Sequence, residues 1–292
     1  MRGLIIGLGC VFAGLALGLW ITRPVTVDLV DIGLAEFEAD ATRGEAVYWA
    51  SGCASCHTAP ESEDKLTLAG GHRFTTEFGV FVAPNVSPHP EAGIGGWTLA
   101  QFASAVRHGT SPGGQHYYPV FPYASYAQMT SPDIADLWAF WQTLPASDRP
   151  SEPHEVAFPF SIRATLGGWK LLYGATGWVQ PAETPELERG RYLVEALAHC
   201  GECHTPRTAL GGLDTANWMA GAPNPSGDGR IPGLRRGQLD WSATDIAYYL
   251  ETGFTPDFDS AGGEMAAVVE NMAQLSPEDR AAIAAYIVAL GE

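Results

Sequence analysis

Two short segments of the chain hold two thiols and an imidazole at the spacing Cys-x-x-Cys-His. The first segment ends at His57 and the second at His204. Two thiols at this spacing can form thioether bonds to the vinyl groups of one haem, and the adjacent imidazole can reach the haem iron from the same side. The pattern therefore predicts two covalently bound haem c groups (iron), held by Cys53, Cys56 and His57 and by Cys200, Cys203 and His204.

Zinc sites and disulfide bonds are the other common uses of paired cysteines. Zn²⁺ takes cysteine and histidine ligands in tetrahedral sets, and paired cysteines in secreted proteins often form disulfides. Neither use explains the histidine that directly follows each pair together with the methionines that come later in each half of the chain. A thioether sulfur suits the open side of a haem iron, where it raises the reduction potential. We therefore favour haem at both motifs.

The sixth ligand of the first iron is expected between the first motif and the middle of the chain. Met129 is the only methionine there, and it stands just before a predicted helix. His108 and His116 are alternatives, and a histidine ligand would lower the potential. We predict Met129 as the ligand.

The second half of the chain offers three methionines for the second iron. Met265 follows the loop-like sequence Gly-Gly-Glu, whereas Met272 is equally well explained as filling of the core. Met219 is the third candidate. We predict Met265 as the ligand.

The two motifs belong to an internal repeat. Arg43-Gly44 precedes the first motif, and Arg189-Gly190 precedes the second with one more residue in the spacer. Later pairs recur at matching intervals, namely Trp97-Thr98 before Gly109 and Trp241-Ser242 before Gly253. The chain therefore contains two homologous domains, as a repeated sequence pattern implies.

Helix start signals recur in both copies of the repeat. A hydroxyl residue followed three positions later by an amide or acidic residue is an N-cap pattern, and it occurs at Thr98, Thr130, Ser242 and Ser276. Apolar residues at helical spacing follow each start. Each copy is predicted to contain a helix before the motif, a long loop, a middle helix and a terminal helix. Residues 151–183, rich in Pro, Gly and aromatics, form a linker expected to pack across both domains.

The N-terminal segment is apolar. Residues 4–21 carry no charge, and Arg2 and Arg23 stand on either side. This length and composition predict a membrane anchor or uncleaved signal over residues 1–25, and the acidic residues that follow place the body outside the cytoplasm. Cys10 in this segment is expected to be a buried, inert thiol rather than a lipidation site.

The charge balance is acidic, with 33 Asp and Glu against 16 Lys and Arg and a formal net charge of -17. This sign argues against nucleic acid as a partner, because nucleic-acid binders need a basic surface. It favours protein partners with basic surfaces, whose approach salt would slow.

The chain resembles the membrane-bound cytochrome c subunits of bacterial periplasmic dehydrogenases, including the alcohol, gluconate and related sugar or aldehyde enzymes. The resemblance rests on residues 83–88, 93–97, 118–123, 158–160 and 199–207. Many such proteins carry methionine where this chain has Phe121, and those with Phe there carry methionine at the place of Met129, so the resemblance supports Met129. The resemblance likewise supports Met265 as the sixth ligand of the second iron. Several relatives carry three haems, whereas this chain has two motifs.

The expected fold class is all-α, with two tandem class I cytochrome c domains, residues 36–150 and 184–292, after an N-terminal transmembrane helix. We expect single-electron transfer from a periplasmic dehydrogenase or other donor to a respiratory acceptor such as a cytochrome or oxidase. The alternative is a haem enzyme, peroxidase-like or thiosulfate-oxidising, with catalysis at one haem. The expected location is the bacterial inner membrane, with the haem domains facing the periplasm.

Overall fold

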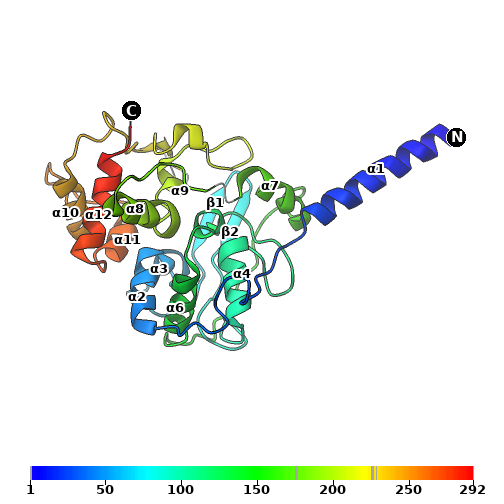
Figure 1. Ribbon diagram of the computed structural model, residues 1–292, viewed down its shortest axis with the longest axis horizontal. Coiled ribbons are helices and arrows are strands. Elements are labelled where there is room, and N and C mark those ends of the chain that lie inside the picture. Colours follow the sequence, from blue (N-terminus) through cyan, green and yellow to red (C-terminus); the bar gives the residue numbers. More distant parts are fainter. Residues whose placement is uncertain (1, 175–176, 225–226, 228, 292) are drawn as a thin grey trace.

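The computed structural model describes residues 2–174, 177–224, 227 and 229–291. Figure 1 shows two helical lobes and a single helix, α1 (Arg2–Ile21), that projects away from them. The first lobe contains α2 (Ala41–Ala50), α3 (Cys53–His57), β1 (Arg73–Thr76), β2 (Gly79–Val82), α4 (Leu99–His108), α5 (Tyr123–Tyr126) and α6 (Ser131–Trp141). The connection between the lobes contains the 3₁₀-helix η1 (Arg163–Thr165) and α7 (Leu166–Tyr173).

The second lobe repeats this order of elements. It contains α8 (Pro185–Arg191), the π-helix η2 (Tyr192–Leu197), α9 (Gly201–His204), η3 (Thr215–Asn217), β3 (Ala222–Pro223), β4 (Arg230–Ile231), α10 (Ala243–Thr252), α11 (Glu264–Met272) and α12 (Pro277–Val288). The structure is therefore mostly helical, as predicted. Each predicted long loop also contains a short antiparallel strand pair, β1 with β2 and β3 with β4.

The predicted helix starts are confirmed by their caps. The side chains of Thr98, Thr130, Ser242 and Ser276 each accept a hydrogen bond from the backbone N–H three residues later. These bonds satisfy N–H groups that the first turn of a helix cannot pair internally. The middle and terminal helices of both lobes therefore begin where the sequence pattern places them.

In each lobe the helix before the motif crosses the terminal helix at a glycine. A Cβ on Gly44 would lie 2.0 Å from the carbonyl oxygen of Asp136 on α6, and a Cβ on Gly190 would lie 2.1 Å from that of Ala282 on α12. The arginine before each glycine binds a carboxylate of the crossing helix, Asp136 for Arg43 and Asp279 for Arg189. The repeated Arg-Gly pair therefore fixes the crossing of these two helices.

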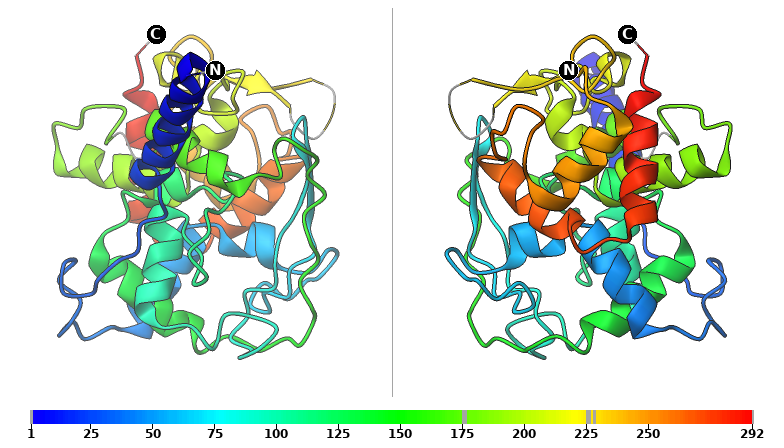
Figure 2. Two further views of the ribbon diagram at one scale, coloured as in Figure 1. Left: turned by 90° about the vertical axis from the view of Figure 1, so that its right-hand side faces the viewer. Right: turned by 90° about the vertical axis from the view of Figure 1, so that its left-hand side faces the viewer.

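One continuous apolar core runs through both lobes. Its fully buried members include Tyr48 and Ile134 in the first lobe and Leu193 and Ile283 in the second. Figure 2 shows α11 of the second lobe lying over α3 and the end of α2, which it contacts. The lobes are therefore packed directly against each other.

The connection between the lobes contacts both of them, as predicted. Lys170 on α7 donates hydrogen bonds to the carbonyls of His108 and Gly109 at the end of α4, the second at 2.9 Å. Trp169 donates to the carbonyl of Leu210 in the second lobe at 2.9 Å. A lysine at a helix C-terminus pairs favourably with the unsatisfied carbonyls there.

Two expectations about the N-terminal segment are not met. Within residues 2–174, 177–224, 227 and 229–291, no helix is both long and apolar enough to cross a membrane. The predicted transmembrane anchor over residues 1–25 is thus unsupported, and the side chains of residues 1–5 and 8 lie outside the described part. Cys10 is exposed on α1, so the prediction of a buried thiol is wrong, because α1 leaves the lobes instead of packing against them.

Candidate functional site

Each Cys-x-x-Cys-His motif forms a short helical turn that follows a residue in the left-handed conformation. Gly52, with φ 63°, precedes α3, and His199, with φ 42°, precedes Cys200 at the start of α9. In a helical turn, residues three and four positions apart lie on the same face. Each turn therefore presents its two thiols and its imidazole together, as covalent attachment and iron ligation by one haem require.

The two motif histidines are held in the same way. The Nδ1–H of His57 donates to the carbonyl of Pro84 at 3.0 Å, and the Nδ1–H of His204 donates to that of Pro232 at 2.8 Å. This bond places the proton on Nδ1 and leaves the Nε2 lone pair for a metal. Burial lowers the pKa of both imidazoles, which favours the neutral, ligating form.

The four motif cysteines form no disulfide; Cys203 is exposed and the other three are partly exposed. Burial raises the pKa of Cys53 and Cys200 to about 12. Both thiols are therefore protonated at neutral pH. Across the described residues no group of three or more His, Cys, Asp or Glu is placed to hold a metal ion, so the zinc alternative gains no support. The residues fit covalently attached haem.

The loops after the motifs are equivalent in the two lobes. The N–H of Gly70 donates to the carbonyl of His57, and that of Gly221 to the carbonyl of His204, at 2.7 and 2.8 Å. The carbonyls of Leu68 and Met219 then accept equivalent bonds from the backbone N–H groups of Val86 and Leu234, which follow the second strand of each pair. Met219 therefore takes the place of a leucine, and both side chains are fully buried. Met219 fills the core.

The two predicted methionine ligands do not occupy equivalent positions. Met129 directly precedes Thr130, the N-cap of α6, and is buried. Leu275 directly precedes the equivalent N-cap in the second lobe and is also buried. Met265 lies in the first turn of α11, ten residues earlier in the chain than Leu275. Met129 and Met265 would thus reach their irons from different points of the repeat.

The other candidates for a sixth ligand have contacts of their own. His116 is buried, and its Nε2 forms a 2.9 Å hydrogen bond with the carbonyl of Thr22. The carbonyl of His108 binds Lys170 at the end of α4. Met272 is buried within the core near the end of α11. These arrangements give His116 and Met272 roles in packing.

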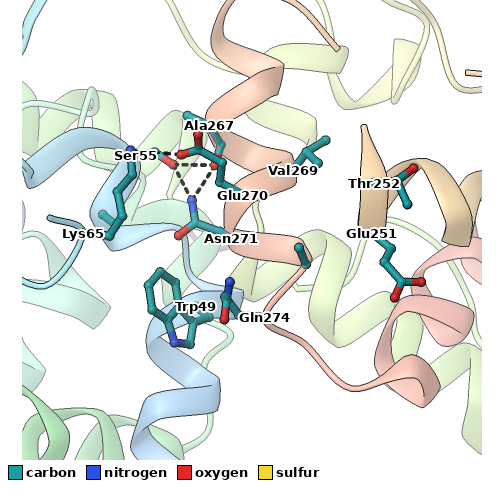
Figure 3. Close-up of a pocket in the computed structure, with 12 residues that line it drawn as sticks. Trp49, Ser55, Lys65, Glu251, Thr252, Ala267, Val269, Glu270, Asn271 and Gln274 are labelled. Atoms are coloured by element: carbon teal, nitrogen blue, oxygen red, sulfur yellow. Dashed lines mark hydrogen bonds and ion pairs between the residues drawn. The ribbon is translucent and has the colours of Figure 1, made fainter. Parts of the chain in front are cut away.

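The first motif contacts α11 of the second lobe across the lobe interface. The side-chain amide of Asn271 on α11 donates to Ser55 Oγ within the first motif and to the carbonyl of Ala267, both at 2.7 Å (Figure 3). Lys65 forms an ion pair with Glu270 at 2.9 Å beside them (Figure 3). These contacts border a cavity of about 440 Å³ between the lobes.

The second cysteines of the two motifs, Cys56 and Cys203, both have raised pKa values. Burial raises the pKa of Cys56 to about 12, and the neighbouring Glu264 and Cys203 add to the effect. Burial likewise raises the pKa of Cys203, and Glu264 adds to this shift too. The residues directly before the two motifs are in contact, because His199 Cε1 lies 3.9 Å from the position that a Cβ on Gly52 would take, so the two attachment segments are neighbours.

Several residues of the site were not identified from the sequence. Pro84 and Pro232 supply the carbonyls that orient the two histidines, 27 and 28 residues further along the chain. The sequence does repeat this feature, because each predicted long loop contains a proline at nearly the same distance from the motif histidine. Asn271 and Ser55 carried no such signal, because a bond between lobes leaves no local sequence pattern.

Comparison with known proteins matches both repeats to one family. The cytochrome c family model matches residues 41–145 and 187–291. A "Diheme cytochrome c-type" protein of Cereibacter sphaeroides is 58% identical over 289 residues, which is 98% of this chain and 97% of that protein.

More distant relatives have longer chains. The "Fructose dehydrogenase cytochrome subunit" of Gluconobacter japonicus is 38% identical over 84% of this chain and 51% of that protein. The "Gluconate 2-dehydrogenase cytochrome c subunit" of Pantoea cypripedii is 34% identical over 87% of this chain and 60% of that protein. The chain thus spans a little over half the length of these two relatives.

Proposed function

This chain belongs to the cytochrome c family and carries two covalently bound haem c groups, and from this premise we propose that it passes single electrons from a dehydrogenase to a respiratory acceptor. The observation that supports the proposal best is that the residues directly before the two equivalent motifs, Gly52 and His199, lie against each other across the lobe interface. Bound haem supplies the one-electron chemistry. The chain supplies attachment, orientation and burial.

The proposed attachment residues are the four motif cysteines and the two motif histidines, Cys53, Cys56, His57, Cys200, Cys203 and His204. The Pro84 and Pro232 carbonyls hold the imidazoles in the ligating tautomer. Met129 and Met265 are the proposed sixth ligands. Because they belong to non-equivalent positions of the repeat, we expect the two irons to differ in potential.

The dehydrogenase partner is proposed by likeness to the named relatives. Relatives that are subunits of fructose and gluconate dehydrogenases match most of this chain. The net charge of -17 would steer basic partner surfaces toward the lobes and make the encounter sensitive to salt. The proposal places the haem lobes in the periplasm, where such dehydrogenases would meet them.

The test uses the full chain, produced in a host that attaches haem to Cys-x-x-Cys-His. We expect the unaltered chain to bind two haems, and we expect Cys56→Ala and Cys203→Ala each to bind one haem fewer. Each haem iron of the unaltered chain should be reduced and reoxidised reversibly by one electron. Reduction by a basic electron-donor protein should slow as ionic strength rises. Fewer than two haems in the unaltered chain, or haems that do not titrate reversibly, would refute the proposal.

Catalysis at the first haem is the second candidate. The observation that favours it is the position of Met129, which corresponds to the non-ligating Leu275. If Met129 left the first iron open, peroxide or a small exogenous ligand would bind there. Turnover of peroxide by the unaltered protein, lost in His57→Ala and kept in His204→Ala, would establish this candidate.

A further inference from the structure

A histidine in the left-handed conformation stands directly before the second motif. His199 has φ 42°, whereas its counterpart in the first repeat is Gly52, with φ 63°. The carbonyls of the two residues accept equivalent hydrogen bonds, from Glu202 and from Ser55. Glycine adopts this conformation without cost, but a residue with a Cβ does not. Backbone strain of this kind persists where the surrounding structure holds it, often at functional positions.

The ring of His199 reaches the first motif. Its Cε1 lies 3.9 Å from the point where a Cβ on Gly52 would stand, so the two equivalent residues face each other. The ring packs edge-on against Tyr126 of the first lobe, with centroids 5.4 Å apart and planes at 78°. Its Nδ1–H donates to the carbonyl of Leu197 at 2.8 Å, which fixes the ring orientation.

Tyr126 completes the contact between the two attachment segments. It is buried, and its hydroxyl donates to the carbonyl of Ser51 at 2.7 Å. Ser51 and Gly52 lead directly into Cys53, and His199 leads directly into Cys200. A continuous set of packed groups thus joins the first cysteine of one motif to the first cysteine of the other.

The lobes are also held together by contacts that do not involve His199. Tyr192 of the second lobe accepts from the N–H of Thr130 at 3.1 Å and bonds to Asp133. Asn271 and Ser55 are joined at 2.7 Å. Because these bonds remain when the His199 ring is removed, the role of the ring can be tested in a docked, folded protein.

We propose that His199 is a positioning residue that holds the two haem-attachment segments together and thereby sets the rate of electron transfer between the haems. An electron that crosses this contact oxidises one iron and reduces the other, with no bond formed or broken and no proton moved. The inference rests on the proposed electron-transfer function and names the residue of the interface on which transfer between the haems depends.

The test compares His199→Gly and His199→Asn, both of which tolerate the left-handed backbone. Phe258→Gly is the matched control, because Phe258 also has a positive φ, 64°, but its side chain is 94% exposed. Three quantities are measured on the full chain with both haems attached: the rate of equilibration between the haems after photoreduction of one, the haem–haem signal in Soret circular dichroism, and the thermal unfolding midpoint.

Both His199 variants are expected to slow equilibration between the haems and to reduce the dichroism signal, because the two attachment segments lose the aromatic contact that holds them together. His199→Gly should keep or raise the unfolding midpoint, because the backbone strain is relieved. Phe258→Gly should leave the rate unchanged. An undiminished rate and dichroism signal in either His199 variant overturns the inference.

The two levels of the proposal fail in different ways. If the unaltered protein binds two haems that never equilibrate, both the electron-transfer function and the role of His199 are wrong. If the unaltered protein equilibrates and His199→Gly or His199→Asn does so equally fast, only the role of His199 is wrong.

Discussion

One methyl group added at Gly44 should force apart the helices that support the first haem site. A Cβ there would lie 2.0 Å from the Asp136 carbonyl oxygen, 2.5 Å from its carbon and 2.9 Å from Phe140 Cβ. Two of these three atoms belong to the backbone of α6 and cannot rotate away. Since real Cβ atoms keep at least 3.0 Å from such neighbours, α2 and α6 must separate by about 1 Å.

The expected cost follows from two opposing effects. Overpacking against a rigid backbone costs about 3 kcal/mol, at the upper end of the usual range, and alanine gains about 1 kcal/mol over glycine within a helix. The free energy of unfolding should therefore fall by about 2 kcal/mol. The unfolding midpoint should fall by about 5 °C if both lobes unfold together and by about 10 °C if they unfold separately.

Thermal unfolding followed by far-UV circular dichroism measures this effect in the protein with both haems attached. Gly168→Ala on α7 is the matched control, because a Cβ there meets nothing within 4 Å and only the helix preference changes. Gly190→Ala repeats the test in the second lobe, where the nearest carbonyl oxygen would lie 2.1 Å away. Equal midpoints for Gly44→Ala and Gly168→Ala would show that the close crossing is not real.

Three further predictions concern the ligands, the helix crossing and the effect of pH. Met129→Leu and Met265→Leu should each remove about half of the long-wavelength absorption band of methionine-ligated ferric haem. The control variant Met272→Leu, which changes a core residue, should leave this band intact. An unchanged band in Met129→Leu or Met265→Leu would show that the substituted methionine is not a ligand. Asp136→Asn should lower the free energy of unfolding by about 2 kcal/mol, because the buried carboxylate accepts from Arg43 and from the Asp40 N–H, and a denaturant midpoint equal to that of the unaltered protein would contradict this. Burial lowers the pKa of Lys170 to about 8, below its value of about 10.4 in the unfolded chain, so between these values the unfolded chain binds more protons and the free energy of unfolding rises with pH. Lys170→Met should remove this rise in denaturation curves recorded across that window, and an identical slope would assign the rise to other groups.

The sequence was sufficient for features that need only a few neighbouring residues. A Cys-x-x-Cys-His segment contains both thiols and the imidazole within one helical turn, so the haem sites could be predicted from His57, His204 and the cysteines before them. The N-caps at Thr98 and Ser242 were predictable for the same reason, since the hydroxyl and its partner are three residues apart. The repeat of these local patterns was enough to predict two domains.

Only the tertiary structure decided how the repeats meet. The Pro84 and Pro232 carbonyls bind histidines 27 and 28 residues away in the chain, and His199 contacts Gly52 across the lobe interface. The histidine bonds depend on how each lobe folds and the contact of His199 on how the two lobes share one core, and no short pattern encodes such packing. Local spacing therefore determined what each motif can bind, whereas the fold of each lobe decided how its imidazole is held and the packing of the lobes decided how close the two attachment segments lie.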